Sequence, residues 1–153
     1  MQCAKLMLVL LGFAATLSAA DPVAGTWKMN PAKAKYRVGK APKQLTLTIT
    51  EAGSDLNVKI EGIAADESKI SFGYTIPAAG GKGSVVVASP FYDGVFGKRL
   101  GPNERVVSYM KGGKAVFTVH AKVSADGSTL ALSSKGLSAW GQTVDSNVFY
   151  NKQ

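Results

Sequence analysis

The residue types that most often carry chemistry are sparse in this chain. His120 is the single histidine, and it alternates with apolar neighbours on a face that it shares with Thr118 and Lys122. Some small β-barrels bind haem through one histidine; the alternative is an ordinary surface or packed residue. A structural zinc ion typically has four nitrogen or sulfur ligands, and the chain offers one imidazole and one thiol. We therefore predict no metal site and no cofactor.

Patterns for covalent catalysis or phosphate binding are also missing. The stretch GGKGS at 80–84 departs from a phosphate-binding loop, because Gly83 separates the lysine from the serine and a valine-rich strand follows. No Gly-x-Ser-x-Gly occurs, and the ten carboxylates are scattered without a paired motif. We therefore predict that the protein is not an enzyme.

A few polar or amphipathic side chains lie in apolar surroundings and are the candidates to reach an internal cavity. Arg99 shares strand parity with Val95, and Arg105 shares it with Val107. If these faces point inward, the arginines need a carboxylate or an anionic ligand; if outward, they are surface charges. The alternation leaves both possibilities open. The predicted ligand-binding residues are Tyr74, Arg99, Arg105, Tyr109 and Tyr150.

The elements that must position these side chains are predicted to be strands. Leu45, Leu47 and Ile49 alternate with threonines, and the segments 56–60 and 70–76 repeat the pattern, which is typical of half-buried β-strands. The further strand candidates are 23–29, 84–88, 94–100, 104–110, 114–123, 128–134 and 142–151, which brings the number to ten. Glycine-rich or Asp/Asn-containing turns separate them. Helix is limited to one short turn near 31–35.

Many short strands joined by short turns predict an all-β fold. Short connections require antiparallel neighbours, and closure of the sheet removes both exposed edges. We therefore predict an antiparallel up-and-down β-barrel of about 8–10 strands, which side chains fill or which holds one small ligand. A two-sheet sandwich is the alternative, but the strand spacing is even and no long Greek-key connection is visible.

The first twenty residues have the pattern of a secretory signal peptide. Lys5 precedes an apolar run at 7–17, and small residues lead to a predicted cleavage site between Ala20 and Asp21. The apolar run is about half the roughly 20 residues of a membrane-spanning helix. We therefore predict one secreted or periplasmic domain, 21–153, that is monomeric. Cleavage would remove Cys3, the only cysteine, so this domain would contain no disulfide.

The positive charge of the chain is concentrated in one segment, 28–43. No acidic residue occurs between Pro22 and Thr50. Such a segment is either a cationic face that attracts anionic ligands or surfaces, or a solvated basic loop. Nucleic acid is not a predicted partner, because no recognition motif is present. The cations are Lys28, Lys33, Lys35, Arg37, Lys40 and Lys43.

The chain resembles a known group of barrel proteins. Gly25-x-Trp27 on the first strand of a meander is similar to the lipocalin and fatty-acid-binding (calycin) group, and the chain most closely resembles small exported bacterial lipocalin-like proteins. The stretches that carry this resemblance are GTWKMNPAKAKY (25–36), APKQLTLT (41–48), KR (98–99), KGGK (111–114), VSADGSTLALSSKG (123–136) and NVFYNK (147–152).

This resemblance implies that Gly25 and Trp27 close the base of the barrel, where lipocalins pack an arginine of a late strand on the tryptophan. The late strands here carry no arginine. The carboxylate-gripping Arg-x-Tyr of fatty-acid-binding proteins is also absent, because Val148 precedes Tyr150 at that spacing, and Pro31 and Pro42 interrupt the region of their lid helices.

The function that the resemblance implies is an exported barrel that binds or carries a small hydrophobic or amphipathic ligand non-covalently. The alternative is a non-enzymatic interaction or structural module that presents the basic 28–43 face to an anionic surface or protein.

Overall fold

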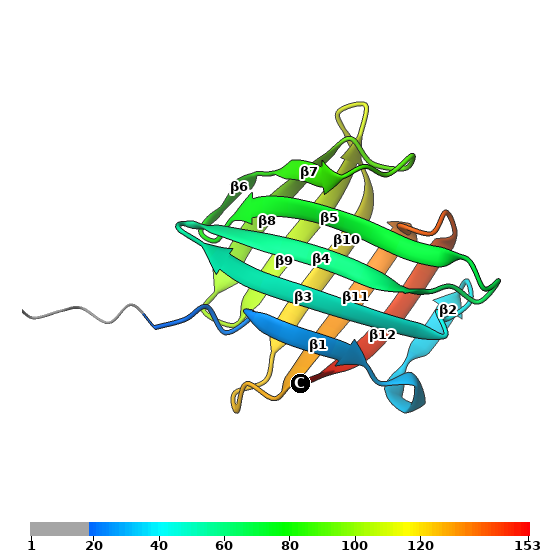
Figure 1. Cartoon of the computed structure of the whole chain (residues 1–153), viewed down its shortest axis with the longest axis horizontal. Helices are drawn as coiled ribbons and strands as arrows, with labels where there is room; N and C mark the ends of the chain where they lie inside the picture. The colour runs from blue at the N-terminus through cyan, green and yellow to red at the C-terminus, as the bar shows by residue number, and fades with distance from the viewer. Residues whose placement is uncertain (1–18) are drawn as a thin grey trace, which may run out of the picture.

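Twelve strands and one short 3-10 turn follow one another along residues 19–153, the part of the chain that the computed structural model describes (Figure 1). The predicted signal peptide therefore lies almost wholly outside the described residues. The strands are β1 (Gly25–Met29), β2 (Lys35–Val38), β3 (Gln44–Ala52), β4 (Asp55–Ile63), β5 (Lys69–Pro77), β6 (Gly80–Lys82), β7 (Ser84–Val87), β8 (Gly94–Gly101), β9 (Glu104–Lys111), β10 (Lys114–Val123), β11 (Thr129–Leu137) and β12 (Thr143–Lys152), and the turn is η1 (Pro31–Lys33).

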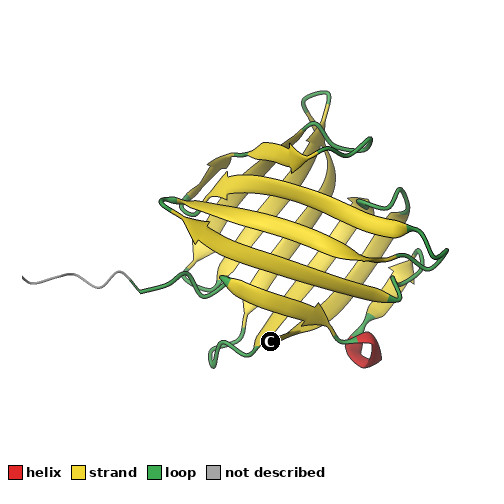
Figure 2. Ribbon diagram, in the orientation of Figure 1, coloured by secondary structure: helices red, strands yellow, loops and turns green. Residues whose placement is uncertain are grey.

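The strands form one antiparallel sheet that curls into a barrel (Figures 1 and 2). Their order is β6-β8-β9-β10-β11-β12-β1-β3-β4-β5-β7, and the first and last strands of the chain meet where Trp27 lies opposite Lys152. β6 pairs with β8 and β7 pairs with β5, so the segment 80–87 bridges the two edges of the sheet. β6 and β7 are separated by one residue and stand at the two ends of this order, so they act as a single interrupted strand. Counted in this way, the eleven strands of the order form a barrel of ten. The predicted up-and-down barrel is confirmed.

Two strands were absent from the predicted set. β2 lies in the basic segment 28–43 and pairs with Asp145–Asn147 of β12, but only Tyr36 on it is partly buried, so no alternation marks it. β6 begins with Gly80 and Gly81, both with positive φ, and a glycine pair in the sequence is typical of a turn. A Cβ at Gly80 would lie 3.1 Å from the Gly97 carbonyl oxygen, so glycine is required by the close approach of β8.

The predicted short helical turn is confirmed as η1. The Asn30 side chain accepts a hydrogen bond from the Ala32 N–H (3.2 Å), and Pro31 occupies the first position of the turn, where its missing N–H costs nothing. No helix within residues 19–153 has the length and apolar character needed to cross a bilayer.

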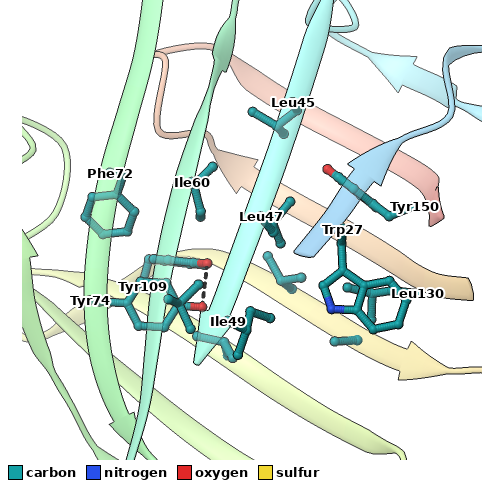
Figure 3. Packing of buried hydrophobic residues seen from close by; sticks show 14 of the residues in the cluster. Trp27, Leu45, Leu47, Ile49, Ile60, Phe72, Tyr74, Tyr109, Leu130 and Tyr150 are labelled. Atoms are coloured by element: carbon teal, nitrogen blue, oxygen red, sulfur yellow. Dashed lines mark hydrogen bonds between the residues drawn. The ribbon is translucent and has the colours of Figure 1, made fainter. Parts of the chain in front are cut away.

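The core is the interior of the barrel, which the alternating apolar side chains of the strands fill from all sides (Figure 3). Trp27 and Leu130 are fully buried near the junction of β1, β11 and β12. On the side of β5, β9 and β10, five aromatic rings form a cluster with centroid separations of 5.0–6.4 Å between contacting rings. These rings belong to Phe72, Tyr74, Tyr92, Tyr109 and Phe117.

Candidate functional site

A cavity of about 80 Å³ remains in the barrel interior. Its wall is mostly apolar and comes from eight of the twelve strands, β2–β5 and β9–β12, with Leu47, Val58 and Phe117 among the lining residues. A dry apolar cavity of about 150 Å³ is known to hold benzene, and drug-sized ligands occupy about 300–1,000 Å³. In this conformation, side chains fill most of the barrel and leave room for only a very small molecule.

Two loops, 88–93 and 138–142, cover one end of the cavity; we call this end the mouth. The Tyr92 hydroxyl donates a hydrogen bond to the Leu137 carbonyl, and Gly141 packs on the Phe91 ring so closely that a Cβ there would lie 2.6 Å from a ring carbon. Loop 138–142 is held in a tight turn by two backbone hydrogen bonds. The Ser138 N–H donates to the Gln142 carbonyl, and the Gly141 N–H donates to the Ser138 carbonyl. Side chains from two separate loops therefore close the mouth.

Trp140 lies in this covering and lines the cavity. Its indole Nε1 is buried and has no hydrogen-bond acceptor, and it is the one buried side-chain polar atom without a partner in residues 19–153. A buried donor without an acceptor costs about 1–3 kcal/mol, and such groups are rare in native proteins. The site therefore presents a donor for which the described part of the chain supplies no acceptor.

Hydroxyl groups lie beside the mouth on neighbouring strands. Ser134 of β11 is opposite Ser146 of β12, which is in turn opposite Tyr36 of β2, and all three line the cavity. Burial raises the pKa of Tyr36 to about 12, although a hydrogen bond with Ser146 opposes this shift. These groups stay neutral at physiological pH and can contact a ligand only as neutral hydrogen-bonding groups.

Four of the five predicted ligand-binding residues line the cavity: Tyr74, Arg105, Tyr109 and Tyr150. The Tyr109 hydroxyl donates to the Tyr74 hydroxyl (3.1 Å), as Figure 3 shows. Burial raises the pKa of Tyr74 to about 12 and also raises the pKa values of Tyr109 and Tyr150 well above the ordinary tyrosine value. These tyrosines therefore remain protonated in the interior. The fifth residue, Arg99, lies outside the cavity wall.

The two arginines meet a carboxylate of the chain itself, at the end of the barrel opposite the mouth, which we call the base. Arg105 Nη2 donates to both carboxylate oxygens of Asp21 (2.8 Å each), and Arg99 Nη1 donates to Asp21 Oδ2 (3.1 Å). The side chains of Asp21 and Arg105 are only 4% and 8% exposed, against 32% for Arg99. The arginines thus have an internal counterion and do not require an anionic ligand.

Gly25 and Trp27 of β1 lie at this end of the barrel. The Trp27 indole Nε1 donates to the Val23 carbonyl (2.8 Å), and the Lys152 ammonium nitrogen lies 5.2 Å from the centroid of the Trp27 ring. Gly25 has φ +138°, and a Cβ there would lie 2.6 Å from Lys152 Cε. The absence of a side chain at Gly25 therefore leaves room for the Lys152 side chain to lie over the Trp27 ring.

Sequence reasoning missed Asp21, Lys152 and Trp140. Asp21 is the first acidic residue of the chain, and Lys152 shares alternation with Tyr150 on the last strand. Those signals are too common to identify a partner. Trp140 lies in a loop outside every alternating segment, so no periodicity connected it with the interior.

His120 lies on the outer face of β10. Its Nε2 is 2.6 Å from Glu104 Oε1, and both side chains are substantially exposed. Residues 19–153 contain no group of three His, Cys, Asp or Glu side chains that could hold a metal ion.

The cations of 28–43 lie on β1, η1, β2 and the following loop. Arg37 forms an ion pair with Asp145, and Lys43 forms one with Glu67. The other four, Lys28, Lys33, Lys35 and Lys40, are exposed and form no ion pair within the described part of the chain. β2 carries Tyr36 into the cavity wall, so several of these charges lie near the mouth.

The chain matches no known protein-family model and no curated protein. Among solved structures, it is similar to the zebrafish ileal bile acid-binding protein, determined in complex with cholic acid, with a TM-score of 0.47 and 11% sequence identity. The similarity covers 86% of this chain and 99% of that chain. Likeness at this level carries no argument about the present protein, and bile acid binding is a property of the zebrafish protein.

Proposed function

We propose that this protein is an exported, monomeric, non-enzymatic barrel that binds a small hydrophobic or amphipathic ligand non-covalently. The observation that carries the proposal is an apolar cavity beneath a mouth where Trp140 Nε1 is buried without an acceptor in residues 19–153. An apolar pocket with few polar groups is the usual character of a small-molecule site. The ligand's apolar part contacts the barrel wall, and its acceptor atom receives the indole hydrogen bond.

The size of the cavity restricts what binds without rearrangement. A ligand of only a few non-hydrogen atoms fits the observed 80 Å³. A longer amphipathic molecule requires the loops 88–93 and 138–142 to separate, which breaks the Tyr92–Leu137 hydrogen bond and the packing of Phe91 on Gly141. The mouth is the place where this costs least, because side chains there close the barrel without ladder hydrogen bonds between the two loops.

The test uses two probes of matched shape: butanone, which carries a carbonyl acceptor, and methylbutene, in which a methylene replaces that oxygen. On the isotopically labelled protein, we expect both probes to shift the methyl resonances of the cavity wall in a saturable way. Butanone alone should move the Trp140 indole N–H resonance. Trp27 is the internal control, because its indole N–H already donates to Val23.

A cavity-filling variant separates specific from general binding. Ala121 is buried and lines the cavity, so Ala121→Leu replaces a methyl by an isobutyl group and should abolish binding of both probes. Ala131→Leu on the outer face of β11 is the matched control and should bind both. If wild-type protein shows no saturable methyl shifts, or if Ala121→Leu keeps them, the cavity is not a binding site.

A second function is favoured by the four exposed cations of 28–43 that have no ion-pair partner in residues 19–153. It is attachment of the β2 side of the barrel to an anionic surface. Binding to phosphatidylglycerol vesicles should then fall steeply with added salt and fall in the triple variant Lys33→Glu, Lys35→Glu, Lys40→Glu. A matched triple reversal at Lys82, Lys98 and Lys122 should bind as wild type does.

A further inference from the structure

The packed part of the protein begins sharply at Asp21. Ala19 and Ala20 are exposed and belong to no element, whereas Asp21 and Val23 are 7% and 4% exposed. The predicted cleavage bond, between Ala20 and Asp21, is therefore the boundary between exposed and packed chain.

The polar groups of Asp21 are all used at the base. The carboxylate accepts hydrogen bonds from Arg105, Arg99 and the Val23 N–H, and the carbonyl accepts from the Ala24 N–H (2.9 Å). The backbone N–H of Asp21 donates to Glu51 Oε1 (2.8 Å), at the end of β3. The Glu51 carboxylate thus contacts the backbone nitrogen of Asp21, which is the atom of Asp21 that cleavage would convert from an amide to an amine.

We propose that the Ala20–Asp21 bond is hydrolysed during export, and that the α-ammonium group of the new N-terminal Asp21 pairs with the Glu51 carboxylate. Water supplies a hydroxyl to the Ala20 carbonyl carbon and a proton to the Asp21 nitrogen, under catalysis by a peptidase. At neutral pH, the amine takes a further proton from solvent. A neutral amide donor becomes a cationic one in the same place.

The exchange strengthens the base. The acceptor is a carboxylate before and after the cut, so what cleavage adds to the hydrogen bond is the Coulombic attraction between the new α-ammonium group and Glu51. The position of the cut also matters, because cleavage one residue later would remove Asp21 and leave Arg105 buried without its carboxylate. Processing at Ala20–Asp21 thus keeps the counterion and adds a second ion pair beside it.

The test uses the full chain expressed in an exporting bacterium. N-terminal sequencing and intact mass of the exported protein should give Asp21 as the first residue. The exported protein is then acetylated at its α-amine at mildly acidic pH, where lysine side chains remain protonated, and mass spectrometry verifies a single acetyl group. Acetylation restores a neutral N–H at Asp21 and therefore mimics the uncut chain at this atom.

Acetylation should lower the Tm of the wild type by about 2–4 °C, because it removes the cationic donor. In Glu51→Gln, it should change the Tm by less than half as much. Glu61→Gln is the matched control, since Glu61 is exposed on β4 and pairs with Lys59, and it should keep the full effect. A different N-terminus, or an undiminished acetylation effect in Glu51→Gln, overturns the proposal. Either result is independent of whether the cavity binds a ligand.

Discussion

The two ends of this barrel are closed by different physical means. At the base, a buried carboxylate holds two arginines, and Trp27 is fixed by a hydrogen bond to Val23 and covered by Lys152. At the mouth, side chains of two loops cover the cavity, and the Trp140 N–H is left without an acceptor in residues 19–153.

This difference separates stability from binding. Opening the base would expose a buried ion pair and leave charges without partners, which is costly. Opening the mouth exposes the partly buried rings of Phe91 and Trp140 and the buried ring of Tyr92, and it breaks one tyrosine hydrogen bond. An incoming acceptor would satisfy a donor that has none in the described part of the chain. The base is therefore expected to stay closed while the mouth admits a ligand.

The largest effect expected is from Asp21→Asn at the base. It leaves Arg105 buried without a negative partner, which should lower the free energy of unfolding by about 3–5 kcal/mol. The matched change near the mouth is Asp145→Asn, which removes the surface ion pair with Arg37 and should cost about 1 kcal/mol or less. Urea denaturation of both variants measures the difference. Equal costs would mean that the buried ion pair does not hold the base.

Most of the fold could be predicted because it depends on local patterns. The alternation in 44–50, 56–60 and 70–76 reports which side chains face inward, and glycine-rich turns report where strands reverse. All ten predicted strands are present. β2 and β6 escaped because one is a short strand with a single partly buried side chain and the other begins with two glycines, so neither carries a periodic signal.

The site was harder to predict because its contacts join distant parts of the chain. Strand parity made Tyr74, Tyr109 and Arg105 candidates for the interior but left the direction of Arg105 open. The partner of Arg105 is 84 residues away and is set by barrel closure. The basic residue that covers Trp27 is a lysine from the opposite end of the chain. No local pattern encodes either contact.

The second prediction uses alkaline pH to test whether the mouth is as dry as the deep interior. Burial raises the pKa of all five tyrosines, with Tyr36 near the mouth and Tyr74 deep inside both shifted to about 12. The folded protein keeps protons that the unfolded chain releases near pH 10, so stability is present below about pH 10 and is lost as pH rises toward 12. Tyrosinate absorbance should therefore rise together with the loss of circular dichroism. If Tyr36 and Tyr92 instead ionise reversibly near pH 10 in folded protein, the mouth is open in solution.

The smallest effect expected is from replacing the indole at the mouth, and its comparison is the same replacement at the base. Trp27→Phe leaves the buried Val23 carbonyl without its donor and removes the ring that Lys152 covers, which should cost about 1–3 kcal/mol. Trp140→Phe removes a donor that has no acceptor in residues 19–153, so the folded state loses no hydrogen bond. The unfolded chain loses the hydration of that N–H, which favours the folded state, so Trp140→Phe should leave stability unchanged or raise it by about 1 kcal/mol.

In probe binding, the larger effect should come from Trp140→Phe and the smaller effect from Trp27→Phe, the reverse of their effects on stability. Trp140→Phe should lose the preference for butanone over methylbutene and keep the cavity methyl shifts, whereas Trp27→Phe should keep both at temperatures where it is folded. Thermal unfolding gives the stability of each variant, and probe titration gives the preference of each variant for butanone over methylbutene. A Trp140→Phe variant that is as destabilised as Trp27→Phe would mean that the indole at the mouth is structural, and the distinction between the two ends of the barrel would then be lost.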